Sequence, residues 1–215
     1  VNHVDYYHLL DMSWTCLWML RWYEDIESDK ALLDYATLYA ERLVKLQDED
    51  GSFPAWVHEE TGEISPYLNK SPETSMHVWF LTHLYKITKR KSYLTAAKAG
   101  MDFVVGEILP EGRWEDFETY WSCAREWDKK QFGEKDPRSG LYYQCNFSIY
   151  WTAEALKELY KVTHERHYLK QGESVLAELS LYQAIWNPAY LSVPVLGGFG
   201  VMNSDDEWND ARQSL

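Results

Sequence analysis

The chain contains an internal repeat that restricts its fold more than any other feature of the sequence. The segment Leu84–Leu94 (LYKITKRKSYL) returns 75 residues later as Leu159–Leu169 (LYKVTHERHYL). A weaker third copy, Trp22–Leu32, lies 62 residues before the first. Repetition at a nearly constant spacing indicates one supersecondary unit that is stacked several times. For a chain of 215 residues we expect a single domain, residues 1–215, with one core.

The spacing of apolar residues predicts that each repeated unit is a pair of antiparallel helices. Helices are expected at His8–Tyr23, Lys30–Gln47, Ser71–Thr88, Ser92–Gly106, Phe147–Val162 and His167–Tyr182. The turns within the pairs are short, whereas the connections between pairs, 48–71 and 107–145, are long. Long connections in a compact domain are usually functional. Because paired helices are antiparallel, the long connections emerge at one end, where we expect the functional site.

Composition and charge argue against several classes of function. The formal net charge of −13 opposes binding to nucleic acids, whose phosphates require a basic surface, and to anionic membranes. No apolar run approaches the roughly 20 residues that cross a bilayer. The three cysteines and the histidines lack the spacings of metal sites, so neither a metal nor another cofactor is predicted. Few cysteines are compatible with a bacterial periplasmic or secreted protein, and a cytoplasmic location stays open.

Three short motifs carry a resemblance to a known group of proteins. They are Gln47–Phe53 (QDEDGSF), the repeated LYKIT turn with Tyr93-Leu94 after it, and Pro72–Ser75 (PETS). They are similar to motifs of the (α/α) toroids of carbohydrate-active enzymes, the six-hairpin glycosidases and related polysaccharide lyases. The resemblance implies an all-α fold of antiparallel helical hairpins arranged as an (α/α)6-type toroid or a portion of one, and a carbohydrate substrate. A ring of six hairpins needs more residues than this, so we expect part of a longer chain.

Glu73 is the first candidate for acid–base chemistry. Glycoside hydrolysis needs one carboxylic acid to protonate the leaving oxygen and a second carboxylate as base or nucleophile. The resemblance implies a catalytic role for Glu73, because unsaturated-uronyl hydrolases carry an acidic residue at this helix start. The plainer interpretation is a first-turn acid that complements the helix dipole. His77 follows one helical turn later and is a candidate proton-transfer partner, with a buried core imidazole as the alternative.

Further acidic candidates lie in the other connections. Asp205, Asp206 and Glu207 follow a Gly-rich approach and precede Trp208, although a capping box explains Glu207 equally well. Asp116 lies in the longest connection, where a solvated surface acid is the alternative. We expect at least one of these residues to join Glu73 in the catalytic site.

Aromatic residues make up 16% of the chain, and those in the long connections are candidates for stacking on sugar rings. The predicted substrate-binding residues are Trp56, Trp114, Arg113, Trp121, Tyr142, Tyr143, Trp208 and Asn209. The alternative for the aromatic ones is packing of the connections onto the end of the bundle. Trp14, Trp18 and Trp22 instead recur every four residues, the spacing of one helix face, and we expect them to belong to the core.

Three functions stay open. The first is a glycoside hydrolase that uses a pair of carboxylates on an oligo- or polysaccharide. The second is a polysaccharide lyase acting on a uronate-containing glycan, with Arg113, Arg125, His77, Tyr142 and Asn146 as available groups. The longest connection holds six Lys and Arg against nine Asp and Glu, so it is not a basic groove, which favours the hydrolase. The third is a non-catalytic helical-repeat scaffold that binds protein, against which the long aromatic connections argue.

Overall fold

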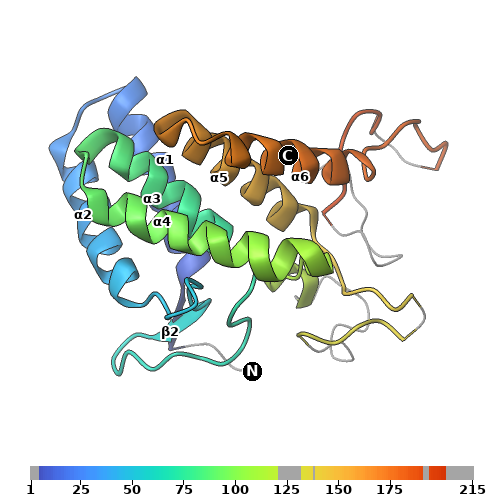
Figure 1. Ribbon diagram of the computed structural model, residues 1–215, viewed down its shortest axis with the longest axis horizontal. Coiled ribbons are helices and arrows are strands. Elements are labelled where there is room, and N and C mark those ends of the chain that lie inside the picture. Colours follow the sequence, from blue (N-terminus) through green and yellow to red (C-terminus); the bar gives the residue numbers. More distant parts are fainter. Residues whose placement is uncertain (1–4, 121–131, 138, 191–193, 202–215) are drawn as a thin grey trace.

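The computed structural model contains six α-helices in the part of the chain that it describes, residues 5–120, 132–137, 139–190 and 194–201 (Figure 1). The helices are α1 (Leu9–Asp25), α2 (Lys30–Lys45), α3 (Thr74–Thr88), α4 (Lys91–Phe103), α5 (Asn146–Thr163) and α6 (Arg166–Ser180). They confirm the six predicted helices, with ends that differ by a few residues. A π-helical turn, Val104–Ile108, and a 3-10 turn, Leu109–Glu111, continue α4. Another 3-10 turn, Phe117–Tyr120, lies in the connection before α5.

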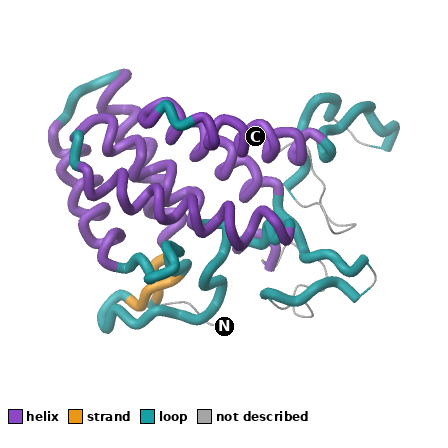
Figure 2. Tube along the Cα trace, viewed as in Figure 1, coloured by secondary structure: helices purple, strands orange, loops and turns teal. Residues whose placement is uncertain are grey.

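A small sheet that the sequence does not predict joins the N-terminal segment to the first long connection (Figure 2). β1 (Tyr6–His8) pairs antiparallel with β2 (Trp56–His58), and His8 lies opposite Trp56. The N–H of Leu9 also donates to the carbonyl of Ala55 at 2.9 Å. Strands of three residues are too short for an alternating pattern to reveal them. Their pairing holds the start of α1 against the connection between α2 and α3.

Three helices form an inner row and three form an outer row (Figures 1 and 2). α3 packs against α1 and α5, and each of these three helices packs against its own hairpin partner. Every residue of α3 from Thr74 to Leu84 is buried, so neighbours cover this helix on all sides. α2 buries only one stripe, which is Ala36, Ala40 and Leu43. The inner row is therefore α1, α3 and α5, and the outer row is α2, α4 and α6.

The repeated sequence motif forms the last turn of an inner helix and the short turn after it. Lys89, after α3, and His164, after α5, have left-handed backbones with φ of 57° and 60°. Their N–H groups donate to the carbonyls of Tyr85 and Tyr160, both at 2.8 Å. The hydroxyl of the repeat threonine donates to the repeat leucine carbonyl four residues earlier, again at 2.8 Å in both copies. These bonds satisfy carbonyl groups that a helix end leaves without a partner.

The short turns lie at one end of the bundle and the long connections at the other (Figure 1). Gly51 lies on the backbone of Ala99, in the C-terminal half of α4. The indole N–H of Trp114 donates to Oε1 of Glu178, in the last turn of α6, at 2.7 Å. The carbonyl of Gly198 accepts a hydrogen bond from a residue just after α6. Because outer helices end where inner helices begin, these connections meet at the N-terminal ends of the inner row, which confirms the expected division.

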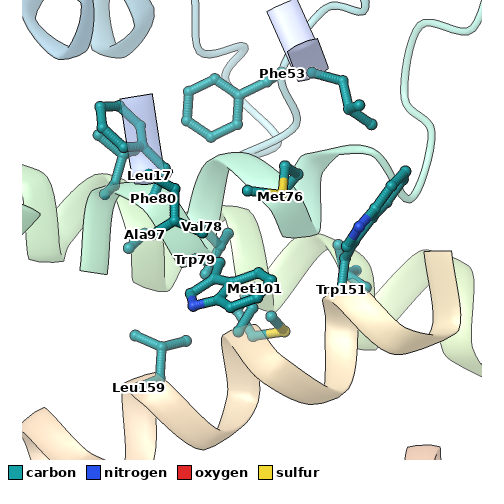
Figure 3. Packing of buried hydrophobic residues seen from close by; sticks show 14 of the residues in the cluster. Leu17, Phe53, Met76, Val78, Trp79, Phe80, Ala97, Met101, Trp151 and Leu159 are labelled. Atoms are coloured by element: carbon teal, nitrogen blue, oxygen red, sulfur yellow. The ribbon is translucent and has the colours of Figure 1, made fainter. Parts of the chain in front are cut away.

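The core fills the space between the two rows. Figure 3 shows part of it, with Leu17 of α1, Phe80 of α3 and Leu159 of α5 among the labelled side chains. Cys16 is also fully buried there, as a free thiol. Among the described residues, no helix is both long enough and apolar enough to cross a membrane.

The prediction that Trp18 and Trp22 belong to the core is wrong, since these side chains are 55% and 50% exposed. The buried face of α1 instead carries Leu9, Leu10, Ser13, Cys16, Leu17 and Leu20. Trp18 lies beside this face, where the guanidinium of Arg21 stands 4.8 Å from its ring centroid. Trp14 does pack on the core, with its ring edge-on to Trp151 at 5.5 Å between centroids.

Gly51 allows the first long connection to lie directly on α4. Its φ is +91°, and a Cβ built on it would lie 2.2 Å from the carbonyl oxygen of Ala99. A side chain here therefore meets both rigid backbone and an unfavourable φ. We expect Gly51→Ala to lower the free energy of unfolding by roughly 2–4 kcal/mol, as measured by urea denaturation.

Gly106→Ala is the matched control, because a Cβ at Gly106 meets no atom within 4 Å. This variant is expected to keep or slightly raise stability, since alanine favours helical backbone. Equal losses in the two variants would contradict the close contact between Gly51 and α4.

Candidate functional site

Two buried carboxyl groups lie where the N-terminal ends of α1, α3 and α5 meet the long connections. Glu73 immediately precedes α3 and is 1% exposed, and Asp116, between α4 and α5, is 0% exposed. α3 begins at Thr74, three residues later than predicted, and the hydroxyl of Ser71 accepts the N–H of Glu73 at 3.3 Å. A helix N-terminus favours a carboxylate, because its free N–H groups and the dipole present positive charge.

Both carboxylate oxygens of Glu73 have partners from distant segments. Oε2 lies 3.1 Å from Nε2 of His8, at the start of α1. Oε1 accepts the backbone N–H of Phe117 at 2.9 Å, which brings the residue before it, Asp116, next to Glu73. A carboxylate without water requires such partners, because an unpaired buried charge is strongly unfavourable. Glu73 therefore ties α1 and the longest connection to the start of α3.

Asp116 is held by its own set of hydrogen bonds. Oδ2 accepts the hydroxyl of Ser148, in the first turn of α5, at 2.7 Å. Oδ1 accepts the backbone N–H groups of Glu118 at 3.0 Å and Thr119 at 3.3 Å. Burial raises the pKa of Asp116 to about 7, and the charge of Glu73 adds to this rise while the bond from Ser148 opposes it. Asp116 therefore stays protonated at pH values at which an ordinary carboxyl group is ionised.

His8 completes the cluster, although the sequence does not identify it as a candidate. Its ring stacks on Trp56, with centroids 4.2 Å apart, and meets the ring of Phe117 edge-on at 4.9 Å. Nδ1 lies 3.0 Å from Oδ2 of Asp11, while Nε2 faces Glu73. Burial alone lowers the pKa of His8, but Glu73 and Asp11 outweigh it and raise the pKa to about 10. His8 belongs to no recognisable sequence motif. Its position beside Glu73 becomes evident only from the pairing of β1 with β2.

Two further side chains border the carboxyl pair. Burial raises the pKa of Tyr67 to about 12, together with the charges of Glu73, Asp116 and Glu115. Glu115 is fully buried, and one of its oxygens accepts the N–H of Gly133 at 3.1 Å. Acidic groups thus gather at the positive ends of the inner helices. Within the described ranges, no group of three or more His, Cys, Asp or Glu side chains is arranged to hold a metal ion.

The structure brings together three of the predicted site residues, which are Glu73, Asp116 and Trp56. His77 lies one turn further along α3, fully buried, with Nδ1 2.7 Å from the hydroxyl of Ser13. Burial lowers the pKa of His77 to about 3, and the charge of His8 contributes to the decrease. A ring that stays neutral at physiological pH favours the alternative weighed for His77, a core imidazole.

Trp114 has a different place from the one predicted. We expected it to stack on a sugar, but its side chain is 0% exposed and its indole N–H is bonded to Glu178. The ring therefore anchors the longest connection to α6. The sequence could not distinguish the two roles, because both require an aromatic residue in a connection.

Three more predicted residues lie in the same connection and have other partners. Arg113 donates to the carbonyl of Lys70 at 2.7 Å. The ring of Tyr142 lies 4.8 Å from the ammonium of Lys135, and Tyr143 is half-buried next to it in sequence. The remaining predicted residues lie outside the described ranges, and they are Trp121, Asp205, Asp206, Glu207, Trp208 and Asn209.

Solved structures of known proteins share this fold. A family 76 glycoside hydrolase (mannosidase) from Bacteroides thetaiotaomicron has a TM-score of 0.58 at 17% identity, covering 83% of this chain and 45% of its own. For a cellobiose 2-epimerase from Spirochaeta thermophila the TM-score is 0.62 at 15% identity, with coverage of 95% and 48%. For an unsaturated glucuronyl hydrolase specific for heparin it is 0.61 at 15% identity, with coverage of 88% and 50%. No protein-family model and no curated protein matches the sequence.

These likenesses confirm the predicted fold, antiparallel helical hairpins arranged as an (α/α)6-type toroid or a portion of one. The chain spans about half the length of the structures that it matches. Membership of a longer chain stays a prediction. At this level of identity the likeness concerns the fold, so function has to be argued from the site.

The raised pKa values predict that both site residues make the protein less stable as the pH rises. Asp116 keeps its proton up to about pH 7 when folded, but only up to about pH 4 when unfolded. Its contribution to the free energy of unfolding is therefore fully present below about pH 4 and lost by about pH 7. His8 makes a second contribution to the free energy of unfolding. It is fully present below about pH 6.5, the pKa in the unfolded chain, and it is lost as the pH rises to about 10, the pKa in the folded protein. We expect Asp116→Asn to remove the first dependence and to be more stable than the wild type at pH 8, measured by urea denaturation.

Asp34→Asn, on the exposed face of α2, makes the same chemical change without burial and serves as the control. Its stability profile should follow that of the wild type across this range. A profile of Asp116→Asn that also runs parallel to the wild type would contradict the raised pKa of Asp116.

Proposed function

We propose that this protein is a carbohydrate-active enzyme that hydrolyses glycosidic bonds in an oligo- or polysaccharide. The observation that carries the proposal is the pair of buried carboxyl groups, Glu73 and Asp116, at the loop-bearing end. Glycoside hydrolysis requires one carboxyl group that holds a proton and one that is ionised. The raised pKa of Asp116 and the cationic partner of Glu73 support these two states. The fold shared with a mannosidase and a glucuronyl hydrolase supports the same class of substrate.

Asp116 is the general acid in this proposal. Its proton passes from the carboxyl group to the glycosidic oxygen as the leaving group departs. The hydroxyl of Ser148 and two backbone N–H groups already point at Asp116, so they stabilise the carboxylate that remains. Glu73 is the base or nucleophile, because its Oε2 lies 3.1 Å from Nε2 of the positively charged His8 ring.

In this proposal a sugar reaches the pair when Phe117, in the 3-10 turn Phe117–Tyr120, moves away from Glu73. In the present arrangement the N–H of Phe117 donates to Oε1 of Glu73, and both carboxyl groups are buried. The turn belongs to no helix of the bundle, so Phe117 can leave Glu73 and its packing on the core while the N–H groups of Glu118 and Thr119 stay bonded to Asp116. Trp56 and Tyr67, both half-buried, would then present rings to a sugar.

A sugar epimerase or isomerase is the second candidate, and His8 is the observation that favours it. Such reactions remove a proton beside a carbonyl group and return it, which an imidazole next to a carboxylate can do. A cellobiose 2-epimerase and a D-mannose isomerase share the fold, each with a TM-score of 0.62. However, a pKa of about 10 leaves His8 protonated at neutral pH, unable to accept a proton. Hydrolysis therefore comes first.

The lyase and the binding scaffold receive less support. A lyase holds the carboxylate of a uronate with cationic groups, whereas the described site places acidic side chains, Glu73 and Glu115, beside Asp116. A scaffold has no need to bury ionisable groups with raised pKa values at one end, whereas such groups are typical of catalytic sites. A periplasmic or secreted location stays a prediction.

Glu73→Gln and Asp116→Asn test the two roles. The substrates would be α-mannan, cellobiose, mannose and an unsaturated glucuronyl oligosaccharide, which represent the chemistry of the structures compared above. We expect each variant to lower kcat about 100-fold or more on the substrate that the wild type hydrolyses, because each removes one proton-transfer group. Release of reducing sugar measures the rate, and a thermal unfolding curve shows that each variant is folded.

Glu63→Gln is the matched control, an exposed acid in the same connection as Glu73, and it should retain full activity. Full activity in both Glu73→Gln and Asp116→Asn would contradict the assignment. A product with new ultraviolet absorbance would instead select the lyase. Interconversion of sugars without bond cleavage would select the epimerase or isomerase.

A further inference from the structure

We propose that Asp11, His8 and Glu73 form a bridge of alternating charge, in which Asp11 holds His8 as an imidazolium ion and His8 positions Glu73 as the ionised base. The charge state of His8 is argued from its contacts alone. Only the role of Glu73 as a base rests on the proposed function. His8 is accordingly a positioning residue, since it acts on the substrate through Glu73.

The geometry of the ring requires two donors. Nδ1 lies 3.0 Å from Oδ2 of Asp11, and Nε2 lies 3.1 Å from Oε2 of Glu73. An ionised carboxylate can only accept hydrogen bonds, and a neutral imidazole has only one N–H. Both contacts are satisfied together when the ring carries two protons. A neutral ring would place a lone pair against one of the carboxylates.

The surroundings of His8 support a cation as well. Trp56 stacks on its ring with an angle of 12° between the planes, and such a face attracts positive charge. Phe117, in the connection between α4 and α5, contacts the ring edge-on and restricts its orientation. The titratable groups that interact with the ring are Asp11 on α1 and, from the start of α3, Glu73 and His77. His77 stays neutral because burial lowers its pKa to about 3, so among the described residues the charges that act on His8 are those of Glu73 and Asp11, both negative.

The bridge also decides which carboxyl group carries the proton. Glu73 has a cation on one side and Asp116 on the other, while Asp116 receives bonds from neutral donors. The charge of Glu73 disfavours a second charge on Asp116 nearby, so a proton on one of the two groups is favoured. The cation next to Glu73 makes Asp116 the site of that proton. From the surface inward, Asp11 is therefore negative, His8 positive and Glu73 negative. The neutral acid Asp116 lies next to Glu73.

Asp11 is the place to test the bridge without damaging the fold. Its side chain is 66% exposed in the first turn of α1, so Asp11→Asn removes the charge and leaves the core untouched. Asp25→Asn, in the last turn of the same helix, is the matched control with the same change of charge. His8→Gln, which keeps an N–H donor without the charge, serves to assign the His8 signal among the seven histidines.

Nitrogen NMR of the ring-labelled protein reads the state of His8 directly. We expect the wild-type signal to show two protonated ring nitrogens from pH 6 to at least pH 8, because both ring nitrogens face carboxylates, in agreement with a pKa raised to about 10. In Asp11→Asn the signal should lose a proton at a lower pH than in the wild type, while Asp25→Asn leaves it unchanged. A neutral ring in the wild type at pH 7, or no difference between Asp11→Asn and the control, would overturn the bridge.

Activity separates this inference from the proposed function. At pH 8 we expect Asp11→Asn to lower kcat about tenfold, the loss of one charge-assisted hydrogen bond, with KM nearly unchanged. At pH 6 the variant should approach the wild type, and Asp11→Glu should restore activity at both values. An equal defect at pH 6 and pH 8 would contradict positioning through charge. If the NMR result holds while Glu73→Gln stays active, the bridge stands and the proposed role of Glu73 fails.

Discussion

The burial of α3 on all sides from Thr74 to Leu84 is the constraint on which the rest of the structure depends. A helix covered from Thr74 to Leu84 has no face in water, so its N-terminal groups must find partners within the protein. Ser71 supplies one partner, and the charged residue before the helix, Glu73, draws in His8 and the backbone of Phe117. The connections that provide these groups are thereby tied to one end of the bundle. A polar cluster in an otherwise apolar interior is the result.

That cluster keeps features that stability alone would not select. Burial of Asp116 raises its pKa to about 7, which means that the folded protein stabilises the neutral acid at the expense of its charge. His8 shows the opposite balance, since two carboxylates hold it charged in spite of burial. Both pKa values are raised, so a neutral acid lies near a charged imidazolium, and strongly perturbed pKa values at one site are typical of acid–base catalysis. The unequal protonation of neighbouring groups, rather than the fold, supports the proposed hydrolysis.

The two ends of the bundle divide structure from chemistry. The repeated motif builds the short-turn end, where Lys89 and His164 close their helices in the same way. The strongest signal in the sequence therefore belongs to the end without the candidate site. Proteins with different activities, a mannosidase, an epimerase and a glucuronyl hydrolase, share the arrangement of helices. Differences in chemistry then have to come from the connections at the other end.

The sequence by itself determined the six helices, their short turns and the loop-bearing end, because these depend on apolar spacing, caps and other local interactions. It also pointed to Glu73, which marks a helix start. Trp18 shows the limit, since spacing identifies one face of a helix but not whether a neighbour covers it. Only the tertiary structure decided that His8 contacts Glu73, 65 positions away, and that the side chain of Asp116 is buried away from solvent. Both follow from contacts between distant segments, which no local pattern in the chain encodes.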